Sequence, residues 1–203
     1  YYQSQPVPVE GILYVHMIDC GQGDAILFEC NGLYALIDSG PNSGGKEVVD
    51  YLNTQHVDKL QFVVGTHPHE DHMGAMYLVL ENFDTEKVYI PEFDESRINT
   101  KWYKKFKNQI NEKNIEIVNP NVGEIFYLDE AKFRVVGQLS ADEAGNDYNN
   151  YSTVIKVSFG EMDILMTGDA ETKVEKAILN SEENIQCEVL KLGHHGYANS
   201  NTS

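Results

Sequence analysis

One short segment of the chain combines three histidines with an aspartate in the pattern H-x-H-x-D-H, which covers His67, His69, Asp71 and His72. Neutral imidazole and carboxylate groups are the ligands that zinc, manganese and iron accept. His67 and His69 stand two residues apart, so both can point to the same side of an extended segment. Asp71 and His72 follow a turn and can face a neighbouring point. The pattern therefore favours two adjacent positions for divalent metal ions, the arrangement used in two-metal hydrolysis.

A second set of candidate ligands lies far along the chain. Asp169 follows a strand-like run and a glycine, and His194 and His195 stand between two glycines. We predict that Asp169 bridges the metal ions and that His194 is a ligand. The predicted metal ligands are therefore His67, His69, Asp71, His72, Asp169 and His194. A helix N-cap is the alternative role for Asp169, and a solvated polar loop is the alternative for either histidine segment.

Three residues near these ligands are assigned other roles. Asp71 positions the attacking water or accepts its proton, in addition to binding metal. His195 donates to the leaving oxygen or supports the ligands. Asp38 follows the strand-like run 33–37 and either supports a ligand or closes a turn. The expected cofactor is one or two divalent ions, zinc first, with manganese or iron as alternatives.

Apolar patterning places these polar residues at the ends of predicted strands. Strands are predicted at 12–18, 25–30, 33–37, 59–65, 87–90, 115–118, 124–128, 132–136, 153–159, 163–166 and 188–192. Asn31-Gly32 between two of them predicts a tight hairpin turn. Helices are predicted at 45–55, 73–80, 96–113 and 170–180, and the segment 140–151 has the composition of turns. This order favours an α/β protein whose sheets are covered by helices over an all-β sandwich.

The chain has 203 residues and a formal net charge of −17. The length suits one domain, which we place at 11–203 after an extended lead-in at 1–10. No apolar run approaches the roughly 20 residues that a membrane-spanning helix needs. The acidic balance argues against binding of nucleic acid by general electrostatics, although bound cations would invert the local field. We therefore expect a small or short phosphodiester substrate; DNA is compatible with the site but disfavoured by the charge.

These residues resemble the metallo-β-lactamase-fold hydrolases. The segment 67–72 matches their signature loop, Asp38 their early aspartate, and Asp169 their bridging aspartate. The pair His194-His195 matches their late histidine motif. The resemblance covers nearly the whole chain and implies a four-layer αββα sandwich that binds divalent metals and hydrolyses its substrate.

A narrower resemblance links the chain to the hydrolase domain of ComEC-type competence proteins. The opening segment 16–25 is similar to their "DVGQGDA" motif, and the segment 191–196 is similar to their "HHG" motif. Asn149, Asn150 and Ser152 match a polar motif of this branch, which implies that they support the ligands or contact substrate. The branch also favours an extracellular or cell-surface location over a cytoplasmic one.

The chain departs from the superfamily pattern in two respects. No histidine occurs between His72 and His194, where many members carry one. The first metal would then have His67, His69 and Asp169 from the protein, with water, Asn149 or Asn150 completing it. Members of the family normally continue beyond the last motif, so we expect further elements past residue 203.

The sequence thus predicts a metal-dependent hydrolase acting on a phosphodiester through an activated water. One alternative is a hydrolase of carbonyl substrates, such as a lactone, a β-lactam or a thioester, on the same metals. A second alternative is a binding module that metal stabilises and that has no catalytic activity. This second alternative gains weight from the missing mid-chain histidine, a feature that the ComEC-type branch shares.

Overall fold

The computed structural model describes residues 11–201, and the predicted lead-in at 1–10 lies outside the described residues. Its first sheet has six strands in the order β1-β2-β3-β5-β7-β8. These strands are β1 (Leu13–Met17), β2 (Ile26–Cys30), β3 (Leu33–Ile37), β5 (Phe62–Val64), β7 (Lys87–Tyr89) and β8 (Glu116–Val118). The first three are antiparallel, and β3, β5, β7 and β8 are parallel to one another. The predicted hairpin at Asn31-Gly32 is confirmed, since both residues adopt positive φ and Cys30 pairs with Leu33.

The second sheet has five strands in the order β13-β12-β11-β10-β9. These are β9 (Ile125–Leu128), β10 (Ala131–Gly137), β11 (Val154–Phe159), β12 (Met162–Met166) and β13 (Val189–Lys191). All neighbours are antiparallel except β12 and β13, which run parallel. A small parallel pair joins β4 (Lys59–Leu60) to β6 (Asp84–Thr85).

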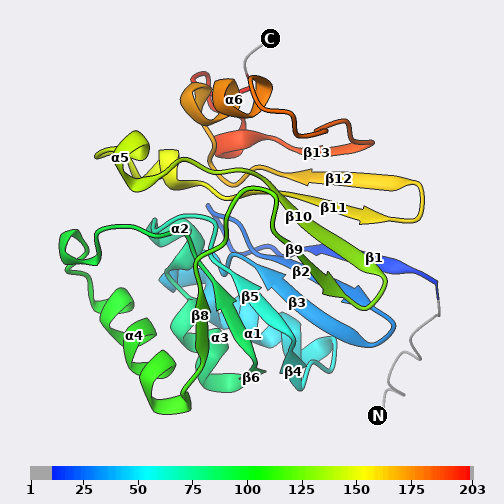
Figure 1. The fold of residues 1–203 in the computed structure, drawn as a ribbon. Helices are drawn as coiled ribbons and strands as arrows, with labels where there is room; N and C mark the ends of the chain where they lie inside the picture. The colour runs from blue at the N-terminus through cyan, green and yellow to red at the C-terminus, as the bar shows by residue number, and fades with distance from the viewer. Residues whose placement is uncertain (1–10, 202–203) are drawn as a thin grey trace.

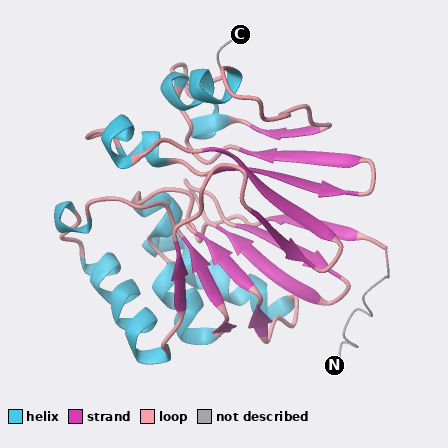
Figure 2. Cartoon of the chain, viewed as in Figure 1, coloured by secondary structure: helices cyan, strands magenta, loops and turns pink. Residues whose placement is uncertain are grey.

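Helices cover the outer faces of both sheets (Figures 1 and 2). The first sheet carries α1 (Gly45–Thr54), α2 (Glu70–Met73), α3 (Met76–Asn82) and α4 (Lys101–Lys113). The second half of the chain carries α5 (Ala141–Ala144) and α6 (Thr172–Leu179). Short 3₁₀ turns occur at η1 (Asn42–Gly44), η2 (Glu95–Arg97), η3 (Tyr148–Tyr151) and η4 (Gly193–Gly196).

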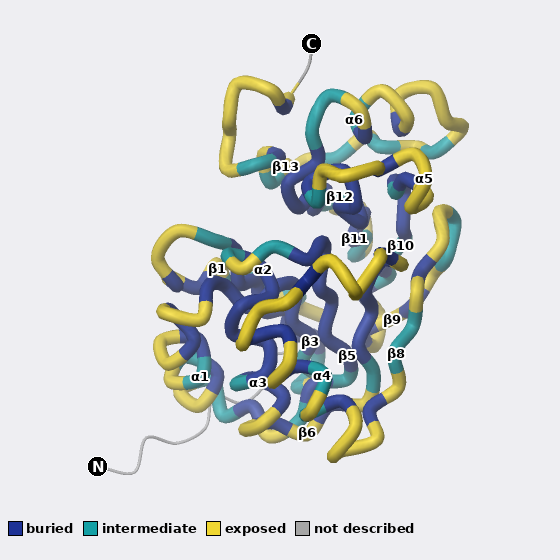
Figure 3. The backbone as a smooth tube through the Cα atoms, turned by 90° about the vertical axis from the view of Figure 1, so that its left-hand side faces the viewer, coloured by how far each residue is buried: buried dark blue, intermediate teal, exposed yellow. Residues whose placement is uncertain are grey.

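The two sheets pack face to face around an apolar layer. Phe62 on the first sheet meets Phe126 and Phe133 of the second edge-on, with ring centroids 5.0 and 5.1 Å apart. A further core lies between the sheets and their helices, and Figure 3 shows the buried backbone running through both layers. The structure therefore confirms the predicted αββα arrangement of the metallo-β-lactamase fold.

Some predicted boundaries are wrong in ways that matter for the chemistry. The helix predicted at 73–80 is two helices, and the first of them, α2, contains Asp71 and His72. Gly74 lies between them because the chain passes so close that a Cβ there would stand 2.7 Å from the Asn42 amide nitrogen. The helix predicted at 96–113 begins only at Lys101, since Thr100 accepts a hydrogen bond from the Tyr103 amide as its N-cap.

The segment 140–151, predicted as turns, contains α5 and η3. Ser140 begins α5 with a capping box, in which its hydroxyl accepts from the Glu143 amide. Among the described residues, no helix is both long enough and apolar enough to cross a bilayer.

Candidate metal centre

The candidate ligands converge at one edge of the two sheets. Asp38 follows β3, the segment from Thr66 to His72 follows β5, Asp169 follows β12, and the two late histidines follow β13. Because β3 is parallel to β5 and β12 is parallel to β13, each pair of strands delivers its loops to the same edge. Strand pairing across each sheet and packing between the sheets thus place residues from distant motifs side by side.

Asp38 is the buried support of this edge and is 1% exposed. Its carboxylate accepts hydrogen bonds from the Thr66 amide and hydroxyl, each at 2.8 Å, and contacts His72 Nδ1 at 2.7 Å. Its backbone has φ of 58°, a conformation that aspartate tolerates better than most residues. Asp38 therefore supports His72, one of the two roles between which the sequence left a choice.

Four side chains form the compact part of the site, here called the four-residue group: Asp71, His72, Asp169 and His195. Each offers a ligand atom within 4.8 Å of the others. His72 Nε2 lies 3.1 Å from Asp169 Oδ1, and His195 Nε2 lies 3.5 Å from both Asp71 Oδ2 and Asp169 Oδ2. His72 Nε2 and Asp169 Oδ1 are buried atoms without a hydrogen-bond partner. Two such orphaned atoms, facing each other, fit a divalent cation that both would coordinate.

His67 and His69, here called the histidine pair, form a looser part. His67 is fully buried, with its Nε2 3.0 Å from His69 Nδ1 and 3.9 Å from Asp169 Oδ2. His69 packs edge-on against Tyr148, with ring centroids 5.6 Å apart. Among residues 11–201, neither histidine belongs to a set of three ligand atoms within 4.8 Å of one another. The histidine pair thus faces Asp169 without closing around one point.

The electrostatics differ from one histidine to the next. Burial alone would lower the pKa of His72, but the carboxylates of Asp38 and Asp169 raise it to about 10. Burial lowers the pKa of His67 well below its usual value and lowers that of His69 as well. At neutral pH the histidine pair is therefore uncharged, the form that binds metal, whereas His72 must release a proton to do so.

Asp71 and His195 form the solvent-facing part of the four-residue group. The hydrogen bond with His195 lowers the pKa of Asp71 to about 2, and the same contact raises the pKa of His195. Asp71 is thus a carboxylate at any physiological pH and can orient a water molecule or accept a proton.

The structure places the two late histidines against different neighbours. His195, predicted to act on the leaving oxygen, lies inside the four-residue group. His194, predicted as a metal ligand, lies with Nε2 3.9 Å from Asp169 Oδ2 and Nδ1 3.1 Å from Glu171 Oε1. Both residues have positive φ, so their side chains leave the turn in directions that no regular periodicity predicts.

The polar motif at 149–152 divides among three functions. Ser152 Oγ accepts a hydrogen bond from the Asp169 amide at 3.1 Å, so it supports Asp169. Asn149 donates to Glu171 at 2.8 Å and lies beside the site. Asn150 instead donates to the Ala144 carbonyl, which turns its amide group toward α5. Its Oδ1, the atom through which an asparagine would bind metal, is buried without a hydrogen-bond partner, so the ligand role of Asn150 stays a prediction.

Asp169 itself does not cap a helix. The N-cap of α6 is Glu171, and no side chain caps that helix by a hydrogen bond. The alternative of a capping role for Asp169 is therefore wrong, and its 1% exposure beside four histidines leaves its carboxylate within the site.

Two residues of the site were missed by the sequence analysis. Lys191 forms an ion pair with Asp24 and donates to the Gly168 carbonyl at 2.9 Å, with both charged side chains 10% exposed. Asp24 Oδ2 lies 3.7 Å from His72 Nδ1, and Asp24 Oδ1 lies 3.7 Å from His195 Nδ1. Asp24 thus contacts the Nδ1 side of two histidines of the four-residue group. Both residues lie within the two segments that resemble the competence proteins, which was the signal available.

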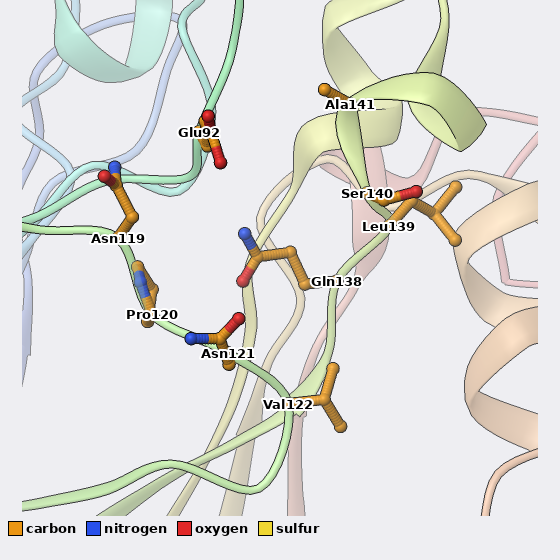
Figure 4. Close-up of a pocket in the computed structure, with 9 residues that line it drawn as sticks. All are labelled: Glu92, Asn119, Pro120, Asn121, Val122, Gln138, Leu139, Ser140 and Ala141. Carbon is orange, nitrogen blue, oxygen red and sulfur yellow. The ribbon is translucent and has the colours of Figure 1, made fainter.

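A separate cavity of about 260 Å³ lies between the loop after β7, the β8–β9 loop and the β10–α5 loop. Figure 4 shows the Gln138 amide directed into the space beside Glu92 and Asn121. None of the residues that line it belongs to the four-residue group or the histidine pair. This cavity is therefore distinct from the metal centre.

Comparisons with known proteins identify the family of the chain. The model of the metallo-beta-lactamase superfamily matches residues 18–203. ComE operon protein 3 of Bacillus subtilis is 28% identical over 200 residues, which cover 90% of this chain and 25% of that protein. Recombination protein 2 of Haemophilus influenzae is 27% identical over 187 residues, which cover 90% of this chain and 21% of that protein. The chain thus spans about a quarter of the length of the curated relatives it matches, and the resemblance to competence proteins is confirmed.

Solved structures share the fold. The metallo-beta-lactamase SMB-1 superposes with a TM-score of 0.61 at 15% identity, covering 92% of this chain and 78% of that one. At this identity the likeness concerns the fold and not the substrate.

Proposed function

The chain belongs to the metallo-beta-lactamase superfamily, and from that premise we propose that it is a metal-dependent hydrolase of phosphodiesters. The observation that carries the proposal is the position of Asp169. Its two oxygens face His72 on one side and His67 on the other, at 3.1 and 3.9 Å, which suits a carboxylate shared by two metal positions. We assign the four-residue group to one position and the histidine pair, with Asp169, to the other.

A divalent ion held there would supply a coordinated water of pKa near 7 and an electrophile for the substrate oxygens. The protein's own residues would perform the remaining tasks. Asp71 is ionised and half-exposed, so it can orient the attacking water and accept its proton. Asp38 and Asp24 hold the far side of His72, which fixes the direction of its Nε2. Zinc suits this set of nitrogen and oxygen ligands, as do manganese and iron.

The phosphodiester assignment is supported by the relatives. One relative is named for recombination and another, from Neisseria gonorrhoeae, is named a competence protein. A shared carboxylate flanked by two cation positions also matches the need to neutralise two oxygens of an in-line displacement. Because the net charge is −17, we propose a short substrate, or a strand that another part of the protein delivers to the site. We also propose a cell-surface location, which the resemblance to the competence proteins implies.

Turnover of three substrate classes tests this function. Metal-free protein is reconstituted with Zn²⁺ or Mn²⁺ and supplied with bis-p-nitrophenyl phosphate, a short single-stranded DNA, a lactone and a β-lactam. We expect hydrolysis of the phosphate diesters and loss of that activity in His69→Ala. Glu70→Gln is the matched control, since Glu70 lies in the same loop but its side chain accepts from the Asn42 amide, away from the ligands.

Two results would contradict the proposal. Turnover of the lactone or β-lactam alone would assign the metals to a carbonyl substrate. Stoichiometric metal without any turnover, together with His69→Ala changing only the melting temperature, would identify a binding module.

A further inference from the structure

Positive charge in this chain is concentrated on one helix. α4 carries five lysines and one acidic residue, Glu112, although the whole chain has a formal net charge of −17. Lys104 and Lys105 stand three and four residues after Lys101, so these three exposed side chains share one face of the helix. The buried residues of α4 lie on the opposite face. A polyanion that approached α4 would therefore meet a locally positive surface, which the net charge conceals.

The lysines of this face are not held by acidic partners. Among the described residues, neither Lys101 nor Lys104 forms an ion pair with a carboxylate. Lys105 contacts an aromatic ring, with its Nζ 4.2 Å from the ring centroid of Tyr77 and 3.2 Å from that hydroxyl. Lys107, in contrast, is paired with a carboxylate of η2 at 2.9 Å. The three ammonium groups of the exposed face can therefore bind an anion without first breaking an ion pair.

Arg97 links this face to the candidate metal centre. It ends η2, four residues before α4 begins, and its side chain is exposed. Its guanidinium donates to the Gly145 and Asn146 carbonyls at 3.1 and 3.0 Å. These bonds use two of its five N–H donors and neutralise none of its charge. Asp94, the acidic residue before the turn, instead accepts hydrogen bonds from Ser96. Arg97 thus retains donors and a full charge for a further anion.

Tyr148 continues the path from Arg97 to the histidine pair. The guanidinium carbon of Arg97 lies 5.1 Å from the centroid of the Tyr148 ring, and the same ring meets His69 edge-on at 5.6 Å. Proteins that bind single-stranded nucleic acid combine a positive surface with aromatic rings on which bases stack. A row of contacts of this kind runs from His69 through Tyr148 and Arg97 to the first turn of α4.

The position of α4 suits a strand that extends away from the metal centre. β7 runs parallel to β5, so the segments that follow these strands emerge at the edge where the candidate ligands gather. The segment after β7 leads into η2 and α4, and Figure 1 shows α4 running away from that edge beside α3. The 13 residues of α4 extend about 20 Å, which spans several nucleotides of a single strand.

We propose that one surface, here called the α4 surface, binds a single nucleic-acid strand and guides it to the metal centre: Arg97, Lys101, Lys104, Lys105 and Tyr148. The four cations contact phosphates, and the ring of Tyr148 with the guanidinium beside it stacks a base next to the metal centre. Because charge and stacking recognise every base alike, the surface binds with little sequence preference. The inference rests on the proposed function, since it names the phosphodiester that the site takes.

Strand binding by metal-free protein tests the inference without turnover. The probe is a fluorescein-labelled single strand of about 12 thymidines, and fluorescence anisotropy gives its Kd over a range of salt concentrations. We expect the logarithm of the affinity to fall against that of salt with a slope of about −3, because each of four cations displaces about 0.7 counterion from a single strand. A labelled dinucleotide should bind much more weakly than the longer strand.

Two variants locate the binding on the α4 surface. Lys101→Gln, Lys104→Gln and Lys105→Gln together should weaken strand binding at least about 10-fold and reduce the salt slope to about −1. Glutamine keeps the helix, since its helix propensity equals that of lysine. Tyr148→Leu should weaken binding about 5-fold or more, whereas Tyr148→Phe keeps the ring and should bind as the wild type does.

A charge-matched control separates the α4 surface from the overall charge. Lys46→Gln, Lys59→Gln and Lys176→Gln together change the net charge by the same amount at positions outside α4. This control should keep the affinity and the salt slope of the wild type. Equal weakening in the control and in the α4 lysine variant would mean that the strand responds to overall charge, which overturns the inference.

Other outcomes also decide the matter. Binding of phosphatidylglycerol vesicles that the lysine variant loses, without binding of the strand, would assign the surface to a membrane. Turnover of bis-p-nitrophenyl phosphate by the wild type, without strand binding that depends on α4, refutes the inference and leaves the proposed function intact. Strand binding that depends on α4, without turnover of any diester, supports the surface and contradicts the proposed function.

Discussion

The four-residue group and the histidine pair share Asp169 but are built differently. The first is backed by side chains that are nearly inaccessible to water, since Asp38 is 1% and Asp24 is 8% exposed. The second is bounded by groups nearer the surface, because the side chain of His194 is 26% and that of Glu171 16% exposed. The difference teaches that the core of the fold assembles the four-residue group, whereas the surroundings of the histidine pair depend on loops nearer the surface.

The largest expected effect on stability comes from Asp38, which supports His72 of the four-residue group. Asp38→Ala removes the acceptor for Thr66 and leaves the charge of His72 without its nearest partner. We expect the free energy of unfolding of the metal-free protein to fall by about 3–5 kcal/mol. Glu171→Ala, the counterpart on the other side, should lower it by about 1 kcal/mol. Urea denaturation of both variants measures the contrast, and equal losses would show that the two sides are supported alike.

The solvent-facing carboxylate predicts the reverse pattern, a loss of activity without a loss of stability. Asp71→Asn removes a proton acceptor beside His195 and should lower kcat on a phosphate diester by at least about 100-fold with metal saturating. At pH 8 the free energy of unfolding should change by less than about 0.5 kcal/mol, since the side chain is 32% exposed. Wild-type kcat in this variant would exclude Asp71 from proton transfer.

The number of protons released on metal binding should differ between the four-residue group and the histidine pair. Since the carboxylates of Asp38 and Asp169 hold the pKa of His72 at about 10 against the effect of burial, binding at its Nε2 must displace about one proton at pH 8. The histidine pair, whose pKa values burial lowers, should release none. Calorimetry in buffers of different ionisation enthalpy measures the protons per ion. An enthalpy independent of the buffer for both ions would refute the charge state of His72.

The smallest expected effect concerns the pH dependence of stability in the metal-free protein. The pKa of His195 is raised, so its contact with Asp71 stabilises fully below pH 6.5 and is lost as pH rises through the folded value. The pKa of Asp71 is lowered to about 2, so its contribution is present above pH 3.8 and is lost as pH falls toward 2. The pair should therefore stabilise most between about pH 4 and 6.5, by less than about 1 kcal/mol because both side chains are partly exposed.

The difference in unfolding free energy between wild type and Asp71→Asn measures this window. It should be greatest near pH 5 and shrink at pH 8. A difference that grows with pH instead would show that His195 stays neutral in the folded protein.

The sequence predicted most of the fold because its apolar runs are strongly patterned. The hairpin at Asn31-Gly32 and the strands that end at Asp38 and Asp169 lie close to where they were expected. The helix near 73–80 was misplaced because the Ala75 amide donates to the Gly40 carbonyl instead of continuing α2, and that hydrogen bond is a tertiary contact. Local periodicity carries no information about such a contact.

What the sequence by itself determined is the chemistry of the ligands, because imidazole and carboxylate types and the spacing of residues 67–72 are fixed by the chain alone. The tertiary structure decided which groups meet. Two consecutive residues with positive φ send His194 and His195 to different neighbours, and packing of the two sheets places Lys191 against Asp24. These outcomes depend on contacts between residues far apart in the chain, and only packing of the two sheets sets those contacts.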